Sequence, residues 1–390
     1  MLATIGARAG SGCSAVRAAA RSLRASSWRR VSWILLGAEA VSELTLPARD
    51  GVVGPSKRAP LLVVDDLVTT FGAGPGVVRA VNGMSLEVLA GESVGIVGES
   101  GCGKSVSMLS IMRLLREPPA SVRASRIEFD GNDILGIPAA EMSNVRGGKI
   151  GMVFQDPMTS LNPVLTIGAQ IRESVETHLG LSRRQANAHA ADLLGLVGIP
   201  DATERLGQYP HHFSGGMRQR AMIAIAVACG PQFLIADEPT TALDVTIQAQ
   251  ILEVIRRLQR ENGMALALIT HDLGVVAGMC DRVLVMYAGH VVEQGRTRAI
   301  FRNPMHPYTQ GLLRAVPRLD TDPDAGLVAI NGSPPNLAAL PAGCPYQARC
   351  PLVIDRCLVE LPDLRDIGSG HYARCWRTGD VDIAMPGAGE

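Results

Sequence analysis

Eight residues decide the fold of this chain: Gly98-Glu99-Ser100-Gly101-Cys102-Gly103-Lys104-Ser105. An apolar run at residues 93–97 precedes them and suits a buried parallel strand, and the residues that follow suit a helix. The glycines let the backbone turn tightly and point its N–H groups inward, which makes an anion-binding nest at a helix N-terminus. Lys104 can then reach the β- and γ-phosphates of a nucleotide, and the Ser105 hydroxyl can bind Mg²⁺. The stretch therefore predicts a nucleoside triphosphate site rather than a flexible glycine-rich turn.

The composition is that of an ordinary globular protein, with 47% hydrophobic and 19% charged residues. At about 150 residues per domain, the 390 residues predict two or three structural units. Lys plus Arg (37) balances Asp plus Glu (37), so net charge points neither to nucleic acid nor to an anionic membrane. No apolar run reaches the ~20 residues that span a bilayer, so we expect any membrane role to be peripheral.

The chain divides into three predicted parts. Residues 1–58 carry six arginines in the first 30 positions and no acidic residue before Glu39. We interpret them as an N-terminal extension, either a disordered arm or the product of a mis-assigned start codon, rather than an organellar targeting peptide. Residues 59–302 are predicted to form the nucleotide-binding domain. Beyond Arg302 the proline content rises and periodicity fades, which marks a small C-terminal region at residues 303–390.

Alternation of strand and helix patterns predicts an α/β fold. Apolar runs at residues 61–64 and 77–81 flank a glycine-rich turn and predict an edge hairpin, and residues 283–293 predict a second hairpin. Between residues 156 and 230 the apolar period changes from two to about 3.6, which predicts a helical subdomain. Strands and helices alternate again from residue 233 to residue 270. We therefore expect a mostly parallel sheet with antiparallel edge strands and helices on both faces.

Polar side chains follow three of the predicted strands. Asp237 and Glu238 come directly after an apolar run, and an open α/β sheet binds its ligands at the carboxyl ends of its strands. Asp237 could hold Mg²⁺ through water, and Glu238 could polarise an attacking water. Gln155 and His271 also end predicted strands and could lie beside the γ-phosphate as neutral groups. The alternatives are a favourable interaction of the acidic pair with the next helix dipole, and a structural or exposed role for His271.

These motifs, in chain order, resemble those of the ATP-binding cassette (ABC) ATPases across residues 61–300. The matching set comprises the phosphate loop, Gln155, residues 214–220 (Ser-Gly-Gly-Met-Arg-Gln-Arg), residues 233–238, Ala242-Leu243-Asp244 and His271. Residues 154–163, 306–309 (His-Pro-Tyr-Thr) and 332–351 are further similar to the ATPase subunits of dipeptide and oligopeptide importers. Phe213 stands where many cassettes have Leu, and we expect that side chain to pack rather than to bind.

The resemblance implies that ATP and Mg²⁺ bind between two cassettes that close face to face. Each ATP would lie between one phosphate loop and the partner's signature segment, so Ser214, Gly215 and Gly216 would serve the partner's nucleotide. A Ser-Gly-Gly helix start does offer N–H donors to a phosphate, although by itself it is only a helix cap. The other implied roles are Mg²⁺ binding by Ser105, Gln155 and Asp237, general base catalysis by Glu238, γ-phosphate contact by His271, a dimer-seam contact by Asp244, and adenine stacking by Phe71.

The implied partners are two membrane permease subunits and a second ABC ATPase subunit, which is either a paralogue or a second copy. A peptide-binding protein would act indirectly, no nucleic acid is expected, and the implied location is peripheral, on the cytoplasmic face of the inner membrane. Another cargo, such as nickel or a sugar, stays open because permease and binding protein choose the cargo. A cassette acting on DNA or ribosomes is disfavoured, since no paired cassette or coiled coil is present. A P-loop kinase or GTPase is disfavoured because residues 214–220 would have no role.

Four cysteines gather in the C-terminal region: Cys344, Cys350, Cys357 and Cys375. A nucleotide-binding chain without a clear signal peptide belongs in a reducing compartment, where clustered cysteines favour a metal or cluster over disulfides. Their spacing of five, six and seventeen intervening residues is not that of a zinc ribbon. Some relatives of this importer class carry an iron–sulfur cluster in a similar region. The resemblance thus implies a [4Fe–4S] cluster, with zinc or unligated thiols as alternatives.

Overall fold

The computed structural model describes residues 59–241, 243–316 and 330–378. The predicted extension at residues 1–58 lies outside these ranges, as do Ala242 and parts of the predicted C-terminal region. An eight-stranded sheet runs through the middle of the described chain in the order β12-β13-β11-β10-β3-β9-β8-β7, and a separate sheet has the order β2-β1-β5-β6, with β4 paired to β1. No helix in the described ranges is long and apolar enough to cross a membrane.

Five consecutive strands of the large sheet are parallel, from its β7 edge inward: β7 (Ile150–Val153), β8 (Phe233–Asp237), β9 (Ala265–Ile269), β3 (Ser93–Val97) and β10 (Arg282–Tyr287). Their side chains are buried on both faces, because successive residues enter two different hydrophobic cores. In β8, Phe233 and Ile235 belong to one core, while Leu234 and Ala236 belong to the other. This two-sided burial explains why these strands read as continuous apolar runs rather than as alternating ones.

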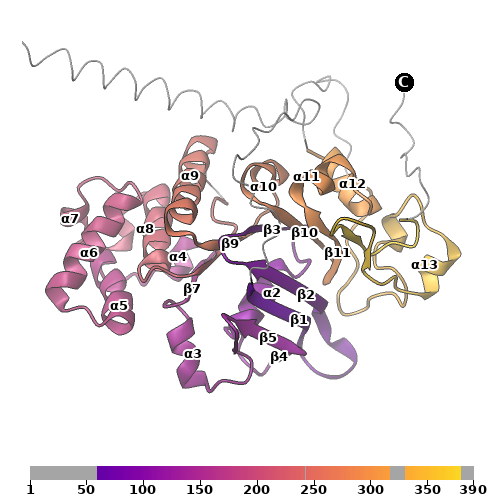
Figure 1. Cartoon of the computed structure of the whole chain (residues 1–390), viewed down its shortest axis with the longest axis horizontal. Coiled ribbons are helices and arrows are strands. Elements are labelled where there is room, and N and C mark those ends of the chain that lie inside the picture. The colour runs from indigo at the N-terminus through magenta and orange to yellow at the C-terminus, as the bar shows by residue number, and fades with distance from the viewer. Residues whose placement is uncertain (1–58, 242, 317–329, 379–390) are drawn as a thin grey trace, which may run out of the picture.

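The two cores fill the two sides of the sheet (Figure 1). One contains helices α9 (Val245–Asn262), α10 (Leu273–Met279) and α11 (Thr297–Arg302), above the sheet in that view. The other contains α2 (Lys104–Ile111) and the antiparallel strands of the second sheet, below it. Those strands are β1 (Pro60–Phe71), β2 (Val78–Leu89), β4 (Ala120–Arg123), β5 (Arg126–Phe129) and β6 (Asn132–Asp133). The predicted α/β fold with a mixed sheet is confirmed.

Both predicted hairpins are present. Strands β1 and β2 pair in antiparallel fashion around the 3-10 turn η2 (Gly74–Gly76), and β10 pairs with β11 (His290–Arg296). The second hairpin turns at Ala288 and Gly289, whose φ angles of 47° and 82° are both positive. Two successive positive φ values mark the type I′ turn that the right-handed twist of paired strands favours.

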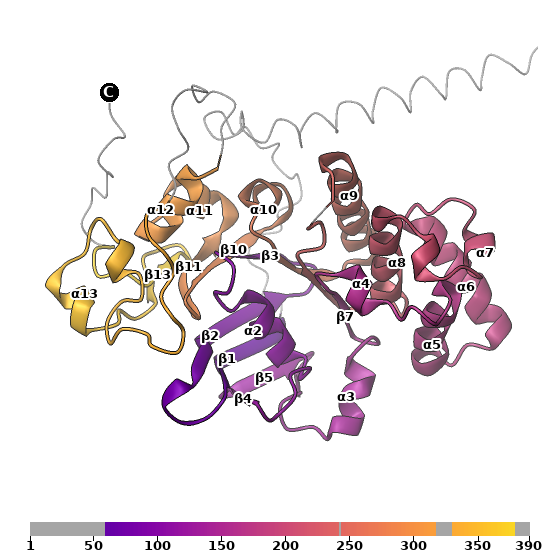
Figure 2. The ribbon, with the colours of Figure 1, turned by 180° about the vertical axis from the view of Figure 1, so that it is seen from behind.

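All of the elements between β7 and β8 are helical, where the sequence predicts a helical subdomain (Figure 2). They are α4 (Pro157–Ser160), α5 (Ile167–Leu179), α6 (Arg183–Leu196), α7 (Ala202–Arg205), η3 (Pro210–His212) and α8 (Gly215–Val227). The short α3 (Ala139–Val145) precedes β7. Ala190, Leu193, Leu194 and Val197 recur at the spacing of one helical face, and all four are buried. Phe213 is 2% exposed, in keeping with the expected packing role.

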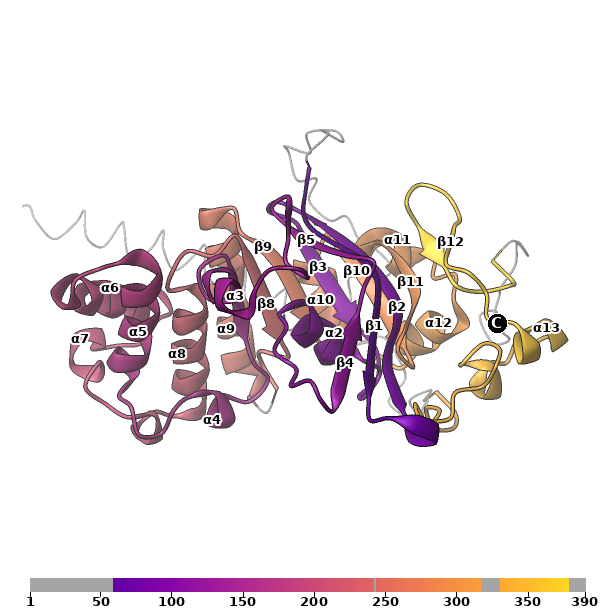
Figure 3. The same ribbon diagram turned by 90° about the horizontal axis from the view of Figure 1, so that it is seen from below.

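The C-terminal region extends the large sheet at its far edge (Figure 3). It comprises α12 (Pro307–Arg314), η4 (Gln347–Arg349), α13 (Asp355–Val359), β12 (Arg365–Asp366) and β13 (Tyr372–Ala373), and β13 pairs with β11. The fully buried Glu293 of β11 accepts the backbone N–H groups of Met305 and His306 at 2.6 and 3.0 Å and His371 Nε2 at 2.7 Å. Three donors satisfy this buried carboxylate, so it fixes the C-terminal region to the sheet.

Candidate functional site

The predicted phosphate loop follows β3 and ends where α2 begins at Lys104. Gly98 and Gly103 have φ angles of 149° and 103°. A Cβ at Gly98 would lie 2.2 Å from the Met286 carbonyl oxygen, and one at Gly103 would lie 2.2 Å from the Ala80 carbonyl oxygen. Both positions therefore require glycine for space as well as for conformation. The loop is held between β2 and β10, which fixes its shape.

Lys104 and Ser105 point to opposite parts of the site. The buried Lys104 ammonium donates hydrogen bonds to the carbonyl oxygens of Gly98 and Glu99 at 2.7 and 2.9 Å, so it lies inside the curve of the loop. The Ser105 hydroxyl donates to Asp237 Oδ1 at 2.8 Å. This bond joins the loop to the carboxyl end of β8, the arrangement expected when a hydroxyl and a carboxylate share one Mg²⁺.

The Asp237 carboxylate is buried, and burial raises its pKa above the ordinary value. The Glu238 charge acts in the same direction, while the Ser105 hydrogen bond and the Lys104 charge act against it. A carboxylate in such surroundings is stabilised by a nearby cation, so its position suits a metal ion.

Two predicted side chains, those of Gln155 and His271, lie beside the Glu238 carboxylate. Gln155 Nε2 donates to Glu238 Oε2 at 3.0 Å, and His271 Nδ1 lies 3.8 Å from Glu238 Oε1. Thr241, which the sequence reasoning missed, donates its hydroxyl to Glu238 Oε2 at 2.9 Å. Gln155, Glu238 and His271 follow β7, β8 and β9, which are neighbours in the sheet. The register of the parallel strands therefore brings together residues that are far apart in the sequence.

Glu238 adopts an unusual backbone conformation with a φ of 43°. Few non-glycine residues occupy this left-handed region, and such residues concentrate at functional sites. The Glu238 N–H donates to the Ile269 carbonyl oxygen at 2.9 Å, which anchors this backbone to β9. Glu238 is thus held at the end of the sheet by its main chain as well as by its side chain.

The signature segment lies away from the phosphate loop of the same chain. Ser214 is the N-cap of α8, where its hydroxyl accepts the Met217 N–H at 3.4 Å. Figures 1 to 3 place α8 beside the other helices of the 156–230 segment and apart from α2. Gly216 packs close to Ile247 of α9, and both Ser214 and Gly215 are exposed. Within the described chain, the structure does not bring Ser214, Gly215 and Gly216 to Lys104.

Asp244 is the N-cap of α9, because its Oδ1 accepts the Ile247 N–H at 2.9 Å. Phe71 ends β1 opposite Val78 of β2, the strand whose Ala80 carbonyl lies against Gly103. Phe71 is half-buried and lies one strand from the loop. Asp244 therefore lies at the start of α9, and Phe71 lies beside the phosphate loop on the side of the second sheet.

The capping role of Asp244 gives a testable prediction. Replacing Asp244 by Ala should lower the free energy of unfolding by about 1 kcal/mol, because α9 loses the acceptor for its first turn. Asp244→Asn should cost much less, since Asn is as good an N-cap residue as Asp. Urea unfolding of both variants at one temperature measures the difference. Equal destabilisation by Ala and Asn would contradict the capping role.

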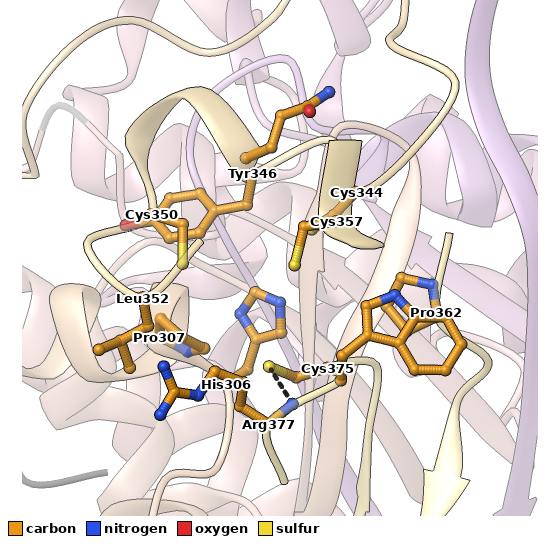
Figure 4. Close-up of a pocket in the computed structure, with 12 residues that line it drawn as sticks. His306, Pro307, Cys344, Tyr346, Cys350, Leu352, Cys357, Pro362, Cys375 and Arg377 are labelled. Carbon is orange, nitrogen blue, oxygen red and sulfur yellow. Dashed lines mark hydrogen bonds between the residues drawn. The ribbon is translucent and has the colours of Figure 1, made fainter. Parts of the chain in front are cut away.

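The four C-terminal cysteines line one pocket with His306, Tyr346 and Trp376 (Figure 4). None of them forms a disulfide. Burial raises the pKa of Cys344 to about 12 and that of Cys350 to about 11, and it also raises the pKa of Cys375. Burial among apolar groups thus favours the neutral thiols, whereas a metal ligand must be a thiolate.

The pocket does not fit a metal group as its side chains are placed. Its volume is about 10 Å³, which is the space of a single water-sized sphere. Among the residues that the structure describes, no group of three or more His, Cys, Asp or Glu side chains could hold a metal ion. The donor set has the chemistry of a cluster or zinc site, but its side chains would have to rearrange to accept one.

Two family models match this chain, each in a different part of it. A family model described as ABC transporter matches residues 81–241, and a model described as the C-terminal region of the oligopeptide/dipeptide transporter matches residues 292–357. The dipeptide transport ATP-binding protein DppD of Bacillus subtilis is 51% identical over 316 residues, which cover 81% of this chain and 94% of that protein. The oligopeptide transport ATP-binding protein OppD of Salmonella typhimurium is 48% identical over 323 residues, covering 83% and 95%.

Solved structures resemble the cassette part. A dimeric ATP-binding cassette in a post-hydrolysis state with ADP and Pi has a TM-score of 0.54 and 26% identity, and the match covers 61% of this chain and 99% of that chain. The protein cbiO1 of Clostridium perfringens, part of an ABC transporter complex, has a TM-score of 0.53 and 27% identity, covering 63% and 91%.

Proposed function

We propose that this chain, which belongs to the ATP-binding subunits of the oligopeptide/dipeptide ABC importer family, hydrolyses ATP to energise the import of di- and oligopeptides through partner permease subunits. The single observation that carries the chemistry is the meeting of Gln155, Thr241 and His271 around the Glu238 carboxylate, next to the bond between Ser105 and Asp237. Asp237 would hold the metal ion and Glu238 would activate the attacking water, and phosphoryl transfer to water requires both roles.

In this proposal, the phosphate loop binds the triphosphate. Backbone N–H groups of residues 98–103 would hold the phosphates together with the Lys104 ammonium. The N–H of Glu99 is the exception, because it donates to the Tyr308 hydroxyl at 2.8 Å. Ser105, Asp237 and Gln155 would hold Mg²⁺, which neutralises charge on the phosphates when bound. Glu238 would accept a proton from the attacking water, with His271 beside the γ-phosphate. Phe71 would stack on the adenine. The separation of Ser214, Gly215 and Gly216 from Lys104 supports a site completed by a second ATPase subunit, with Asp244 at the seam.

The assembly that we propose has two cassettes and two permease subunits at the cytoplasmic face of the inner membrane, with a peptide-binding protein acting from outside. The second cassette is either a paralogue or another copy. ATP would favour the closed pair and hydrolysis the open pair, so the nucleotide would shift an interface between two states. We propose the division into residues 1–58, 59–302 with a helical subdomain at about 156–230, and 303–390 on the same basis.

Peptide-stimulated ATP hydrolysis tests the proposal. The chain should co-purify with two permease subunits, and ATP hydrolysis by the purified complex should rise when the loaded peptide-binding protein is added. Di- and oligopeptides should stimulate the reaction, whereas Ni²⁺ and sugars should not. Stimulation by Ni²⁺ alone would instead assign the alternative cargo. A chain that hydrolyses ATP only with DNA or ribosomes would contradict transport.

The four C-terminal cysteines give a separate prediction, because we propose that Cys344, Cys350, Cys357 and Cys375 bind a [4Fe–4S] cluster. Their convergence on one pocket and the composition of the donor set support it. The anaerobically purified chain should contain iron and sulfide and absorb broadly in the visible range. Cys357→Ser should abolish both signals, whereas Cys229→Ser, outside the pocket, should not. Zinc without iron would support the first alternative, and the absence of any metal would support free thiols.

A further inference from the structure

Arg349 of the C-terminal region makes a partly buried ion pair with the phosphate loop. Its Nη1 donates to Glu99 Oε2 at 2.7 Å and its Nη2 donates to Glu99 Oε1 at 2.9 Å, although 250 positions separate the two residues. The Arg349 side chain is only 4% exposed and that of Glu99 is 26% exposed. The two parallel bonds form the fork geometry that gives arginine–carboxylate pairs their strength and their fixed orientation. The Glu99 side chain, predicted as part of the nucleotide loop, is thus committed to Arg349.

The remaining donors of Arg349 also have partners. Its Nε donates to the Asn331 carbonyl oxygen at 2.9 Å, Nη2 to the Ile330 carbonyl oxygen at 3.3 Å, and Nη1 to the Tyr287 hydroxyl at 3.3 Å. These bonds and the two to Glu99 match the five N–H groups that a guanidinium carries. Its hydrogen bond to Glu99 raises the Arg349 pKa. The group is therefore fully satisfied and always charged.

A second contact holds the main chain of the same loop residue. The Glu99 N–H donates to the Tyr308 hydroxyl at 2.8 Å. Tyr308 is fully buried and lies at the start of α12, where the His306 side chain accepts the Tyr308 N–H at 3.0 Å. Its ring packs against those of Tyr287 and Tyr346, with ring centroids 4.6 and 5.5 Å away. The aromatic contacts join β10, α12 and the 344–350 segment into one packed unit beside the loop.

The contacts of Arg349 and Tyr308 with Glu99 are connected to Lys104 through Glu99 itself. Glu99 is held by Arg349 through its side chain and by Tyr308 through its N–H, and its carbonyl oxygen accepts the Lys104 ammonium at 2.9 Å. A shift of Glu99 would therefore move an acceptor that orients Lys104. Arg349 itself ends η4, immediately before Cys350. The path from the cysteine-bearing segment to the phosphate-binding lysine thus passes through two residues.

We propose that Arg349 is a positioning residue of the ATP site, through which the C-terminal region sets the affinity of the phosphate loop for nucleotide. The inference rests on the proposed function, because it concerns the same site. Arg349 acts through Glu99 and Lys104 and does not itself contact the nucleotide. The Tyr308 hydroxyl supports the same loop residue. Removing the pair should loosen the loop without removing any phosphate ligand.

The test is nucleotide binding by a double-mutant cycle. Arg349→Met and Glu99→Gln should each weaken the Kd for ATP by about tenfold, within the range of coupling between linked sites, and the double variant should be little worse than either. Arg349→Lys should have an intermediate effect, because it keeps the charge but not the two-pronged geometry. KM for ATP should rise while kcat changes little, because binding of ground and transition states weakens together.

Arg356→Met is the matched control. Arg356 lies in the same region and pairs with Glu360 at 2.7 Å, but both side chains are about half exposed and neither contacts the loop. It should bind ATP like the wild type. A purely structural role for Arg349 predicts lower thermal stability with an unchanged Kd, or effects of Arg349→Met and Glu99→Gln that simply add, and either result would overturn the proposal.

Thermodynamic linkage supplies a second readout that does not depend on activity and that begins with the wild type. If Arg349 couples the two regions, binding of ATP should slow hydrogen exchange at the backbone amides of residues 346–350 in the wild type. Arg349→Lys should reduce this protection while leaving exchange in β8 and β9 unchanged. Equal protection in both proteins would contradict the coupling. If the wild type itself fails to bind ATP, the proposed function fails, and that outcome is distinct from an unchanged Kd in the variants.

Discussion

Glu238→Gln should still bind ATP, yet kcat for hydrolysis should fall by about 100-fold or more, the contribution expected from a general base. The substitution removes the proton acceptor but keeps the shape of the side chain. A glutamine oxygen in place of Oε2 can accept the same bonds from Gln155 and Thr241, and its amide can face His271. The site should therefore remain assembled while it cannot take a proton from water.

The same variant should accumulate as an ATP-bound closed pair of cassettes, because in the proposed cycle hydrolysis reopens the pair. Size measurement with and without ATP, in parallel with single-turnover hydrolysis, tests both expectations. Glu253→Gln is the matched control, since Glu253 is an exposed glutamate of α9 whose carboxylate lies 3.6 Å from Arg256. A fully active Glu238→Gln variant would rule out the assignment of the base.

Lys104→Met should weaken ATP binding by about 100-fold or more, the second large effect. Each hydrogen bond to a charged group contributes about 1.5–3 kcal/mol, and a tenfold change in Kd corresponds to about 1.4 kcal/mol. Two lost phosphate contacts are therefore enough for the predicted loss. Lys104 is buried inside the loop, where its ammonium lies against two carbonyl oxygens, so solvent cannot replace it.

Equilibrium binding of a fluorescent ATP analogue measures the effect of Lys104→Met. Lys149→Met, at an exposed position before β7, should leave the Kd unchanged. Thermal unfolding in the absence of nucleotide should show that the Lys104 variant is folded. Wild-type affinity in a folded Lys104→Met variant would show that the triphosphate binds elsewhere.

The sequence predicts that the residues after β7, β8 and β9 lie close together, because parallel strands end at the same edge of a sheet. Gln155, Glu238 and His271 follow three separate apolar runs, so once those runs are placed in one parallel sheet, their last residues must be neighbours. The phosphate loop is predictable for a related reason. Its glycines are required by the local space and backbone angles. Such local requirements can be recognised in a short contiguous stretch of sequence.

Contacts between distant segments are not predictable in this way. Arg349 and Glu99 are 250 positions apart, and nothing in the residues around either one indicates the other. Thr241 contacts Glu238 across a turn in which Glu238 has a positive φ of 43°, a conformation that a single sequence does not indicate for glutamate. The His-Pro-Tyr stretch at 306–308 contributes to the family resemblance, but its contact with the phosphate loop emerges only in the fold.

The four C-terminal cysteines could be predicted from the sequence only in part. Their number and clustering indicate a common site, and they do line one pocket. Their spacing does not identify a metal, and the pocket as folded is too small for one. Cysteines that only pack and cysteines that bind a metal are hard to distinguish in a sequence, because both are buried thiols on neighbouring loops.

ATP-driven uptake of a labelled oligopeptide into proteoliposomes is the most direct test of the proposed transport. The vesicles would contain this chain with its partner ATPase and permease subunits, and the binding protein and peptide would be added on the opposite side from ATP and Mg²⁺. We predict accumulation of peptide with the wild type, and none with ADP or with Glu238→Gln. Undiminished uptake by the Glu238→Gln complex, or steady ATP hydrolysis without uptake of any di- or oligopeptide, would contradict peptide import driven by this site.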